Sequence, residues 1–176
     1  MKKYSSKNRK GFTIVELLVS IGLFAVIISV AMGGFVRALR TQRQVVALIN
    51  ANSNVSLVVE QLAREIRTGY NFPSVSGAQT SLAFTDAKGE TITYAQGVAA
   101  DGSGTITRQV NDGSPAQITA DNVDIRYLNF TLLNSPNYPP RITITIGLSP
   151  SAASAPIVSE NVTNIQTTIS ARSFSS

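Results

Sequence analysis

The sequence predicts an α+β fold in which one long N-terminal α-helix packs on an antiparallel β-sheet. The first observation is that residues 12–36 contain a single charged side chain, Glu16. The second is that apolar residues then recur three and four positions apart, which is the period of one helix face. The third is that, beyond about residue 70, short runs rich in β-branched and aromatic residues alternate with turn residues, which is typical of strands.

Residues 1–11 form a basic leader. This segment holds five of the fifteen Lys and Arg residues and no acidic residue, so it accounts for the whole formal net charge of +5. The rest of the chain is formally neutral and shows no basic patch with interleaved aromatic residues, so nothing indicates a nucleic-acid partner. The basic residues of the leader are Lys2, Lys3, Lys7, Arg9 and Lys10.

The composition excludes several kinds of site. The chain contains no Cys and no His. It therefore offers no thiol nucleophile, no Cys or His metal ligand and no side chain suited to acid–base chemistry near neutral pH. We predict a non-enzymatic protein without a cofactor.

Residues 12–36 are predicted to cross a membrane. A helix of this length reaches about 37 Å, which is enough for a hydrocarbon core of about 30 Å. Five basic residues precede the segment, and Arg37, Arg40 and Arg43 follow it. This bias places the N-terminus in the cytoplasm and exports the remainder. We expect the three arginines to lie among anionic lipid headgroups.

Residues 37–70 are predicted to continue the same helix as an amphipathic half that enters the globular domain. Glu60 and Arg64 are spaced for an ion pair, and Gly69 followed by Pro73 supplies a stop. One helix is therefore expected from about residue 12 to about residue 68. Its predicted apolar positions are Val45, Leu48, Ile49, Val55, Val59, Leu62 and Ile66.

Residues 71–176 are predicted to form the antiparallel sheet. Short strands joined by tight turns favour antiparallel pairing, and the apolar face of the helix is its natural cover. A small, proline-flanked stretch, 149–156, is predicted to be a flexible surface loop. The expected strands are 81–85, 91–95, 105–110, 123–133, 141–148 and 161–171.

The junction at Gly11 and Phe12 permits three kinds of processing. Cleavage between these residues would discard the charge and keep the apolar helix. An ordinary secretory signal would instead be cut near Ala31, leaving a soluble exported protein that begins at Met32. An uncleaved segment would tether the exported domain as a membrane-anchored binding module. The position of cleavage separates these alternatives.

The junction residues Lys10-Gly11-Phe12-Thr13-Ile14-Val15-Glu16 closely resemble those of type IV prepilins and of the pseudopilins of type II secretion. This resemblance implies a pilin-like fold and a structural role as a filament subunit. It also implies that a prepilin peptidase cuts after Gly11 and methylates the new amine of Phe12. Other pilin or pseudopilin subunits, an inner-membrane assembly platform and membrane lipid are the further implied partners, and the mature chain would pass from the cytoplasmic membrane into a surface or periplasmic filament.

Two finer expectations follow from the same resemblance. A carboxylate in an apolar segment generally has a partner, and the amine of Phe12 on a neighbouring subunit would provide one for Glu16 and fix the stagger between subunits. The runs at 62–67 and 166–172 and the overall size look more like minor pilins or J-type pseudopilins than major subunits.

Two weaker patterns do not lead us to predict a binding site. Aspartates occur in Asp-Gly pairs at Asp101 and Asp112 and again at Asp121 and Asp124. Their spacing is not that of an EF-hand, and Asp-Gly pairs are typical of turns, so no metal is predicted. Glycines at 22, 33 and 34 suit either close helix packing or a place where the helix bends.

Overall fold

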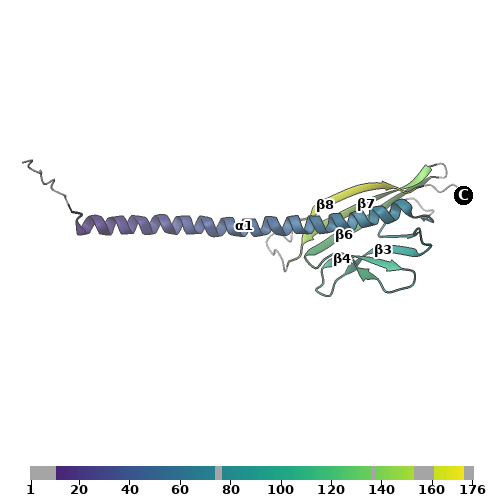
Figure 1. The fold of residues 1–176 in the computed structure, drawn as a ribbon, viewed down its shortest axis with the longest axis horizontal. Coiled ribbons are helices and arrows are strands. Elements are labelled where there is room, and N and C mark those ends of the chain that lie inside the picture. The colour runs from purple at the N-terminus through teal and green to yellow at the C-terminus, as the bar shows by residue number, and fades with distance from the viewer. Residues whose placement is uncertain (1–10, 74–76, 136–137, 153–160, 173–176) are drawn as a thin grey trace, which may run out of the picture. The chain divides into compact units, whose positions relative to one another are not determined.

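The computed structural model describes residues 11–73, 77–135, 138–152 and 161–172. All of the predicted leader except Gly11 lies outside these residues. The chain divides into two compact units, residues 1–42 and 43–176. One helix, α1 (Ile14–Thr68), contributes to both (Figure 1). The predicted long helix is thus confirmed, with its start two residues later than expected.

In the second unit, one face of α1 is buried in the hydrophobic core. The buried residues are Ala51, Val55, Val58, Leu62 and Ile66. The predicted face was wrong at its N-terminal end, because Val45 and Ile49 are exposed. Helical spacing identified the C-terminal positions, but it could not show where along the helix the sheets begin to cover it.

The end of α1 is fixed by close packing as well as by local sequence. The Gly69 N–H donates to the carbonyl of Ile66 at 3.3 Å. A Cβ on Gly69 would lie 2.5 Å from Cδ2 of Phe84, so only glycine allows the chain to leave the helix against this ring. The predicted Glu60–Arg64 ion pair is present at 2.8 Å on the exposed side of the helix.

The strands form two four-stranded antiparallel sheets, not the single sheet that we expected. One sheet has the order β1-β6-β7-β8, and the other has the order β2-β3-β4-β5. All pairings within the sheets are antiparallel, as predicted. The strand bounds are β1 (Gly77–Gln79), β2 (Ser81–Thr85), β3 (Thr91–Val98), β4 (Gly104–Val110), β5 (Ala116–Gln117), β6 (Val123–Ser135), β7 (Tyr138–Pro150) and β8 (Thr163–Ser170).

Each of the six predicted strands is present. The strands that the sequence analysis missed, β1 and β5, have three and two residues, too few to show a period.

The predicted loop at 149–156 was wrong at its start. Ser149 pairs with Asp124 inside the sheet, and both Ser149 and Ser151 are buried. Residues 153–156 of that loop lie outside the described residues.

The two sheets meet where β3 and β4 approach β6. The Gly104 N–H donates to the Asp124 carboxylate at 2.8 Å, and the Gln96 amide donates to the Ile125 carbonyl at 2.9 Å. A Cβ on Gly104 would collide with that carbonyl group. Glycine at this position therefore lets the backbones of the two sheets come into contact.

One hydrophobic core joins the C-terminal part of α1 to both sheets. Figure 1 shows this part of the helix running alongside the strands. Phe84 lies between two other aromatic rings, at centroid distances of 5.3 Å to Phe72 and 6.3 Å to Tyr94. The α+β class with a long helix packed on antiparallel sheets is therefore confirmed, and the fold is pilin-like. The largest fully buried side chains are Tyr94, Phe84, Phe130, Leu62, Ile66, Leu82, Ile92, Ile106, Ile125, Leu128, Leu132 and Ile142.

Candidate processing and assembly segment

The bond between Gly11 and Phe12 lies in an exposed segment just before α1. Gly11, Phe12 and Thr13 have no regular secondary structure, and Phe12 is 81% exposed. A Cβ added to Gly11 would meet no described atom within 4 Å. The described part of the fold therefore places no steric demand for glycine at this position. A requirement for glycine here would have to come from another molecule that binds this segment.

Thr13 is the N-cap of α1. Its side-chain oxygen accepts a hydrogen bond from the Glu16 N–H at 3.2 Å, and its carbonyl accepts one from the Leu17 N–H at 3.1 Å. Such a cap satisfies a backbone donor that the first turn leaves free. The sequence analysis missed this role, although Thr followed three positions later by Glu is a recognised helix-start pattern.

Glu16 lies in the first turn of α1, where a carboxylate interacts favourably with the positive end of the helix dipole. It is the sole acidic residue of α1 before Glu60. Its side chain is exposed, and the described part of the chain supplies it with neither a salt bridge nor a side-chain hydrogen bond. The structure thus brings Glu16 within one helical turn of Phe12 and leaves its carboxylate available.

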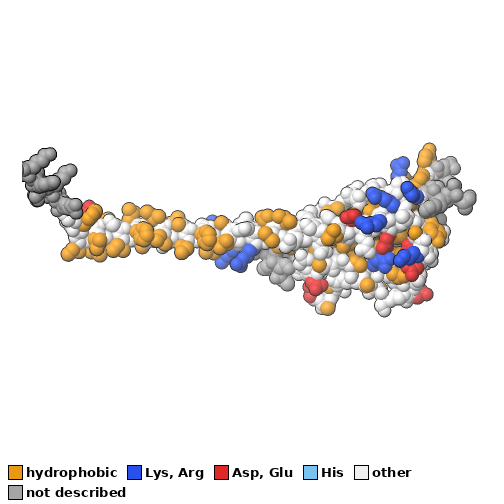
Figure 2. Space-filling view, viewed as in Figure 1, with side chains coloured by type: hydrophobic (Ala, Val, Ile, Leu, Met, Phe, Trp, Pro, Cys, Tyr) orange, Lys and Arg blue, Asp and Glu red, His pale blue; other side chains and the backbone are white. Residues whose placement is uncertain are grey.

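The first unit presents an almost continuous apolar surface. Hydrophobic side chains cover this part of α1 (Figure 2), and none of the side chains from Phe12 to Arg43 is buried. By length and composition α1 can cross a membrane, with a most apolar window of mean hydropathy 2.6. The hydroxyls of Ser20 and Ser29 donate to carbonyls four residues back, at 2.7 and 2.8 Å, so these polar groups are satisfied inside the helix.

Between residues 14 and 43 of α1, the contacts among the described residues explain neither the glycines nor the arginines. A Cβ on Gly22, Gly33 or Gly34 would meet nothing within 4 Å. Close packing at these glycines would therefore require a neighbouring helix. The arginines that follow the apolar segment, Arg37, Arg40 and Arg43, are exposed, and the ion pairs between described residues do not include them.

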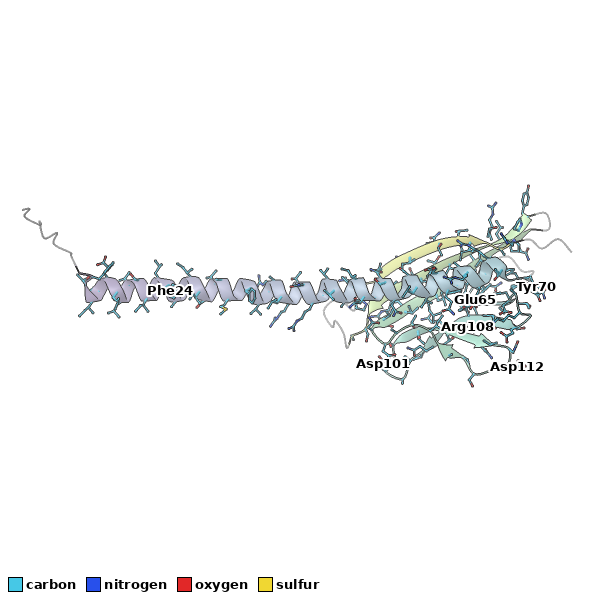
Figure 3. All side chains as sticks on the ribbon, in the orientation of Figure 1. Phe24, Glu65, Tyr70, Asp101, Arg108 and Asp112 are labelled. Carbon is cyan, nitrogen blue, oxygen red and sulfur yellow. The ribbon has the colours of Figure 1, made fainter. Side chains whose placement is uncertain are left out.

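The sequence analysis missed a partly buried polar cluster in the second unit. The Tyr94 hydroxyl donates to Oε2 of Glu65 at 2.8 Å. Nε of Arg108 donates to the same oxygen at 3.2 Å, and Figure 3 labels Glu65 and Arg108 in this region. Burial first, and then the hydrogen bond to the Glu65 carboxylate, raise the pKa of Tyr94 above its ordinary value. The cluster ties the end of α1 to β3 and β4, and its members are separated by 29 and 43 residues in the chain.

Two of the aspartates considered as metal ligands, Asp101 and Asp124, form hydrogen bonds in a turn and at the sheet junction. Asp101 accepts hydrogen bonds from the hydroxyl and the N–H of Ser103, which lower its pKa. Asp124 accepts from Gly104 and pairs with Arg126 at 3.3 Å. Within residues 11–73, 77–135, 138–152 and 161–172, no three metal-ligating side chains of the acidic, Cys or His type gather in one place.

Comparison with known proteins gives one match. Residues 6–32 match the model of the prokaryotic N-terminal methylation motif. No curated protein and no solved structure matches the chain. The match includes the Gly11–Phe12 junction, the cap at Thr13, Glu16 and most of the apolar segment. The chain therefore carries the N-methylation motif, or class III signal peptide, typical of the type IV prepilin and pseudopilin family, which is a family of structural and non-enzymatic filament subunits.

Proposed function

We propose that this chain is a minor subunit of a type IV pilus or of a type II secretion pseudopilus. In this proposal a prepilin peptidase removes residues 1–11 and methylates the amine of Phe12. Residues 12–36 then anchor the chain in the cytoplasmic membrane, with the N-terminus on the cytoplasmic side. The amphipathic helix of 37–70 and the sheet domain of 71–176 are exported, and the assembly platform of the inner membrane transfers the subunit into the filament.

The observation that carries this proposal is the match at residues 6–32, which spans an exposed Gly11–Phe12 junction directly before a capped helix. The test is the intact mass and N-terminal sequence of the protein from membranes of cells that contain a prepilin peptidase. An N-methylated Phe12 terminus is expected. A chain that starts at Met1 would indicate an uncleaved anchor, and one that starts at Met32 would mean that the helix is a discarded signal.

The requirement for Gly11 can be separated from any effect on folding. We expect Gly11→Val to fold normally, because the described fold leaves room for a side chain at this position. We expect it to accumulate as the uncleaved precursor, because the proposed peptidase would require glycine there. Gly22→Ala is the matched control, since that glycine also has free space around it. Equal cleavage of wild type and Gly11→Val would contradict the proposed processing site.

We further propose that Glu16 pairs with the Phe12 amine of a neighbouring subunit and so sets the stagger of the filament. A carboxylate and an amine that are both removed from water stabilise one another only when they meet in good geometry. This pairing would use a carboxylate that forms no ion pair with any described residue of its own chain, and it would place that carboxylate beside the new N-terminus of the neighbouring subunit.

Replacement of Glu16 by Ala or Leu is therefore expected to leave membrane insertion and cleavage intact while abolishing incorporation into filaments. The measurement is the amount of the subunit in sheared filaments relative to the amount in membranes. Glu60→Ala is the control, because it removes another carboxylate from the same helix but breaks only an exposed ion pair. Normal incorporation of the Glu16 variants would refute the assignment.

A further inference from the structure

A small pocket lies at the turn end of the β6–β7 hairpin. It has a volume of about 320 Å³ and is lined by Leu133, Tyr138, Pro139 and Arg141. Leu133 is 57% exposed and Tyr138 is 68% exposed, so these two side chains are not part of the hydrophobic core. Large apolar side chains that surround an exposed hollow are typical of a surface that receives a partner.

Three arginines come together at the same end of the domain, and we refer to Arg67, Arg141 and Arg172 as the arginine cluster. The Arg172 N–H donates to the Arg67 carbonyl at 3.1 Å, which joins the end of β8 to the last turn of α1. Arg141 lies opposite Ser170 on β8. Figure 2 shows several Lys and Arg side chains on this side of the domain, with Asp and Glu side chains among them.

No ion pair between described residues involves the arginine cluster. All three side chains are exposed, and the ion pairs found among the described residues belong to other arginines, namely Arg64, Arg108 and Arg126. The helix dipole favours a cation at the end of α1, which accounts for Arg67. It does not account for Arg141 or Arg172, which come from the strands.

We propose that the pocket and the arginine cluster bind a segment of a partner protein in which a carboxylate adjoins a large apolar side chain. Guanidinium groups bind carboxylates through paired hydrogen bonds, and Arg141 belongs both to the cluster and to the pocket wall. The apolar side chain of the partner would contact Leu133, Tyr138 and Pro139. This site lies outside the methylation motif and does not depend on how the N-terminus is processed.

A phosphate polymer fits the site less well. Binding to such a polymer draws on many phosphate contacts and a strongly positive surface. Beyond Gly11, the ten basic residues of this chain equal its ten acidic residues. Three of the four residues that line the pocket are uncharged, so they offer contact area to an apolar side chain and no charge to a phosphate.

The test is fluorescence anisotropy with the full-length chain in detergent micelles. The probe is a labelled, terminally blocked peptide, Gly-Asp-Phe-Glu-Leu-Gly, and its comparison peptide carries Asn and Gln in place of the two acids. The acidic peptide is expected to bind about tenfold more tightly than the amide peptide. Arg141→Gln and Tyr138→Ser should each weaken its binding by about tenfold.

Lys88→Gln is the matched control, because it also removes one positive charge from an exposed position but lies in the turn between β2 and β3. Its binding should equal that of wild type. Absence of binding, equal binding of both peptides or unchanged binding by the Arg141 and Tyr138 variants would overturn the proposal. Tighter binding of a thymidine oligonucleotide, with a steep loss in salt, would replace it with a polyanion site. None of these results bears on cleavage at Gly11, so failure here and failure of the proposed function are distinguishable.

Discussion

Two glutamates on α1, Glu65 and Glu16, differ in whether their side chains have partners within the chain. Glu65 accepts hydrogen bonds from Tyr94 and Arg108 inside the domain, whereas Glu16 has no side-chain partner within the described structure. A carboxylate that is removed from water is stable only if other groups satisfy it. Glu65 therefore finds its partners within the chain, and the proposed filament would supply the partner of Glu16.

The hydrogen bond from Tyr94 can be tested by Tyr94→Phe, which keeps the buried ring. We expect the free energy of unfolding to fall by about 1–2 kcal/mol, because one hydrogen bond to a partly buried carboxylate is lost. The measurement is reversible denaturant unfolding of the full chain in micelles. Tyr127→Phe is the control, since its hydroxyl bonds to Asn164 at an exposed site and its loss should cost less. Equal effects of the two variants would contradict the structural role of the cluster.

The pH dependence of the free energy of unfolding should also show the effect of Tyr94. The pKa of Tyr94 is raised in the folded protein above its ordinary value of 10.0. A group of this kind contributes stability that is fully present below the unfolded pKa and is lost as the pH rises toward the folded pKa. Wild type should therefore lose stability as the pH rises above 10, and Tyr94→Phe should show a smaller loss. Parallel profiles for the two proteins would contradict this prediction.

At the scale of elements, α1 has two kinds of surface. From Ile14 to Arg43 none of its side chains is buried, whereas from Ala51 to Ile66 one face lies in the core. Both parts of the helix are rich in apolar residues. They differ in that the sheets cover only the second part. The exposed apolar surface requires lipid or neighbouring subunits, which agrees with membrane anchoring followed by assembly.

Two leucines on α1 give a matched test of the buried face. Leu62 is fully buried and Leu57 is 67% exposed. Leu62→Ala is expected to lower the free energy of unfolding by about 2–5 kcal/mol, because it removes packed atoms and leaves a cavity. Leu57→Ala should change it by less than about 0.5 kcal/mol. Denaturant unfolding of both variants measures the difference, and similar losses would show that the two faces are wrongly assigned.

For the whole molecule, charge is concentrated in the segment that the proposed cleavage removes. The precursor has an isoelectric point of about 9.8 and a formal net charge of +5, and all of that excess lies in residues 1–11. The second unit, residues 43–176, is held together by one core that α1 shares with both sheets. The residues of this core all lie beyond the leader, between Ala51 and Ile169.

Isoelectric focusing should follow the processing of the whole chain. Cleavage after Gly11 leaves ten basic and ten acidic residues, so the mature form should focus several pH units below the precursor and close to neutrality. Methylation of the Phe12 amine keeps a positive charge and should not shift the band further. The control is Gly11→Val, which should stay at the basic position. Co-migration of protein from cells with and without the peptidase would contradict cleavage at this bond.

The sequence by itself determined the long helix, the apolar segment, the antiparallel strands and the junction at Gly11. These features are local, since each depends on a period, a run or a motif within about thirty neighbouring residues. Tertiary structure alone decided the division into two sheets, the burial of Ser149 and Ser151, and the cluster around Glu65. The arginine cluster and its pocket likewise combine α1, the β6–β7 hairpin and the end of β8. Such contacts depend on which distant strands pair and where the helix is covered, and single-sequence periodicity carries no information on either.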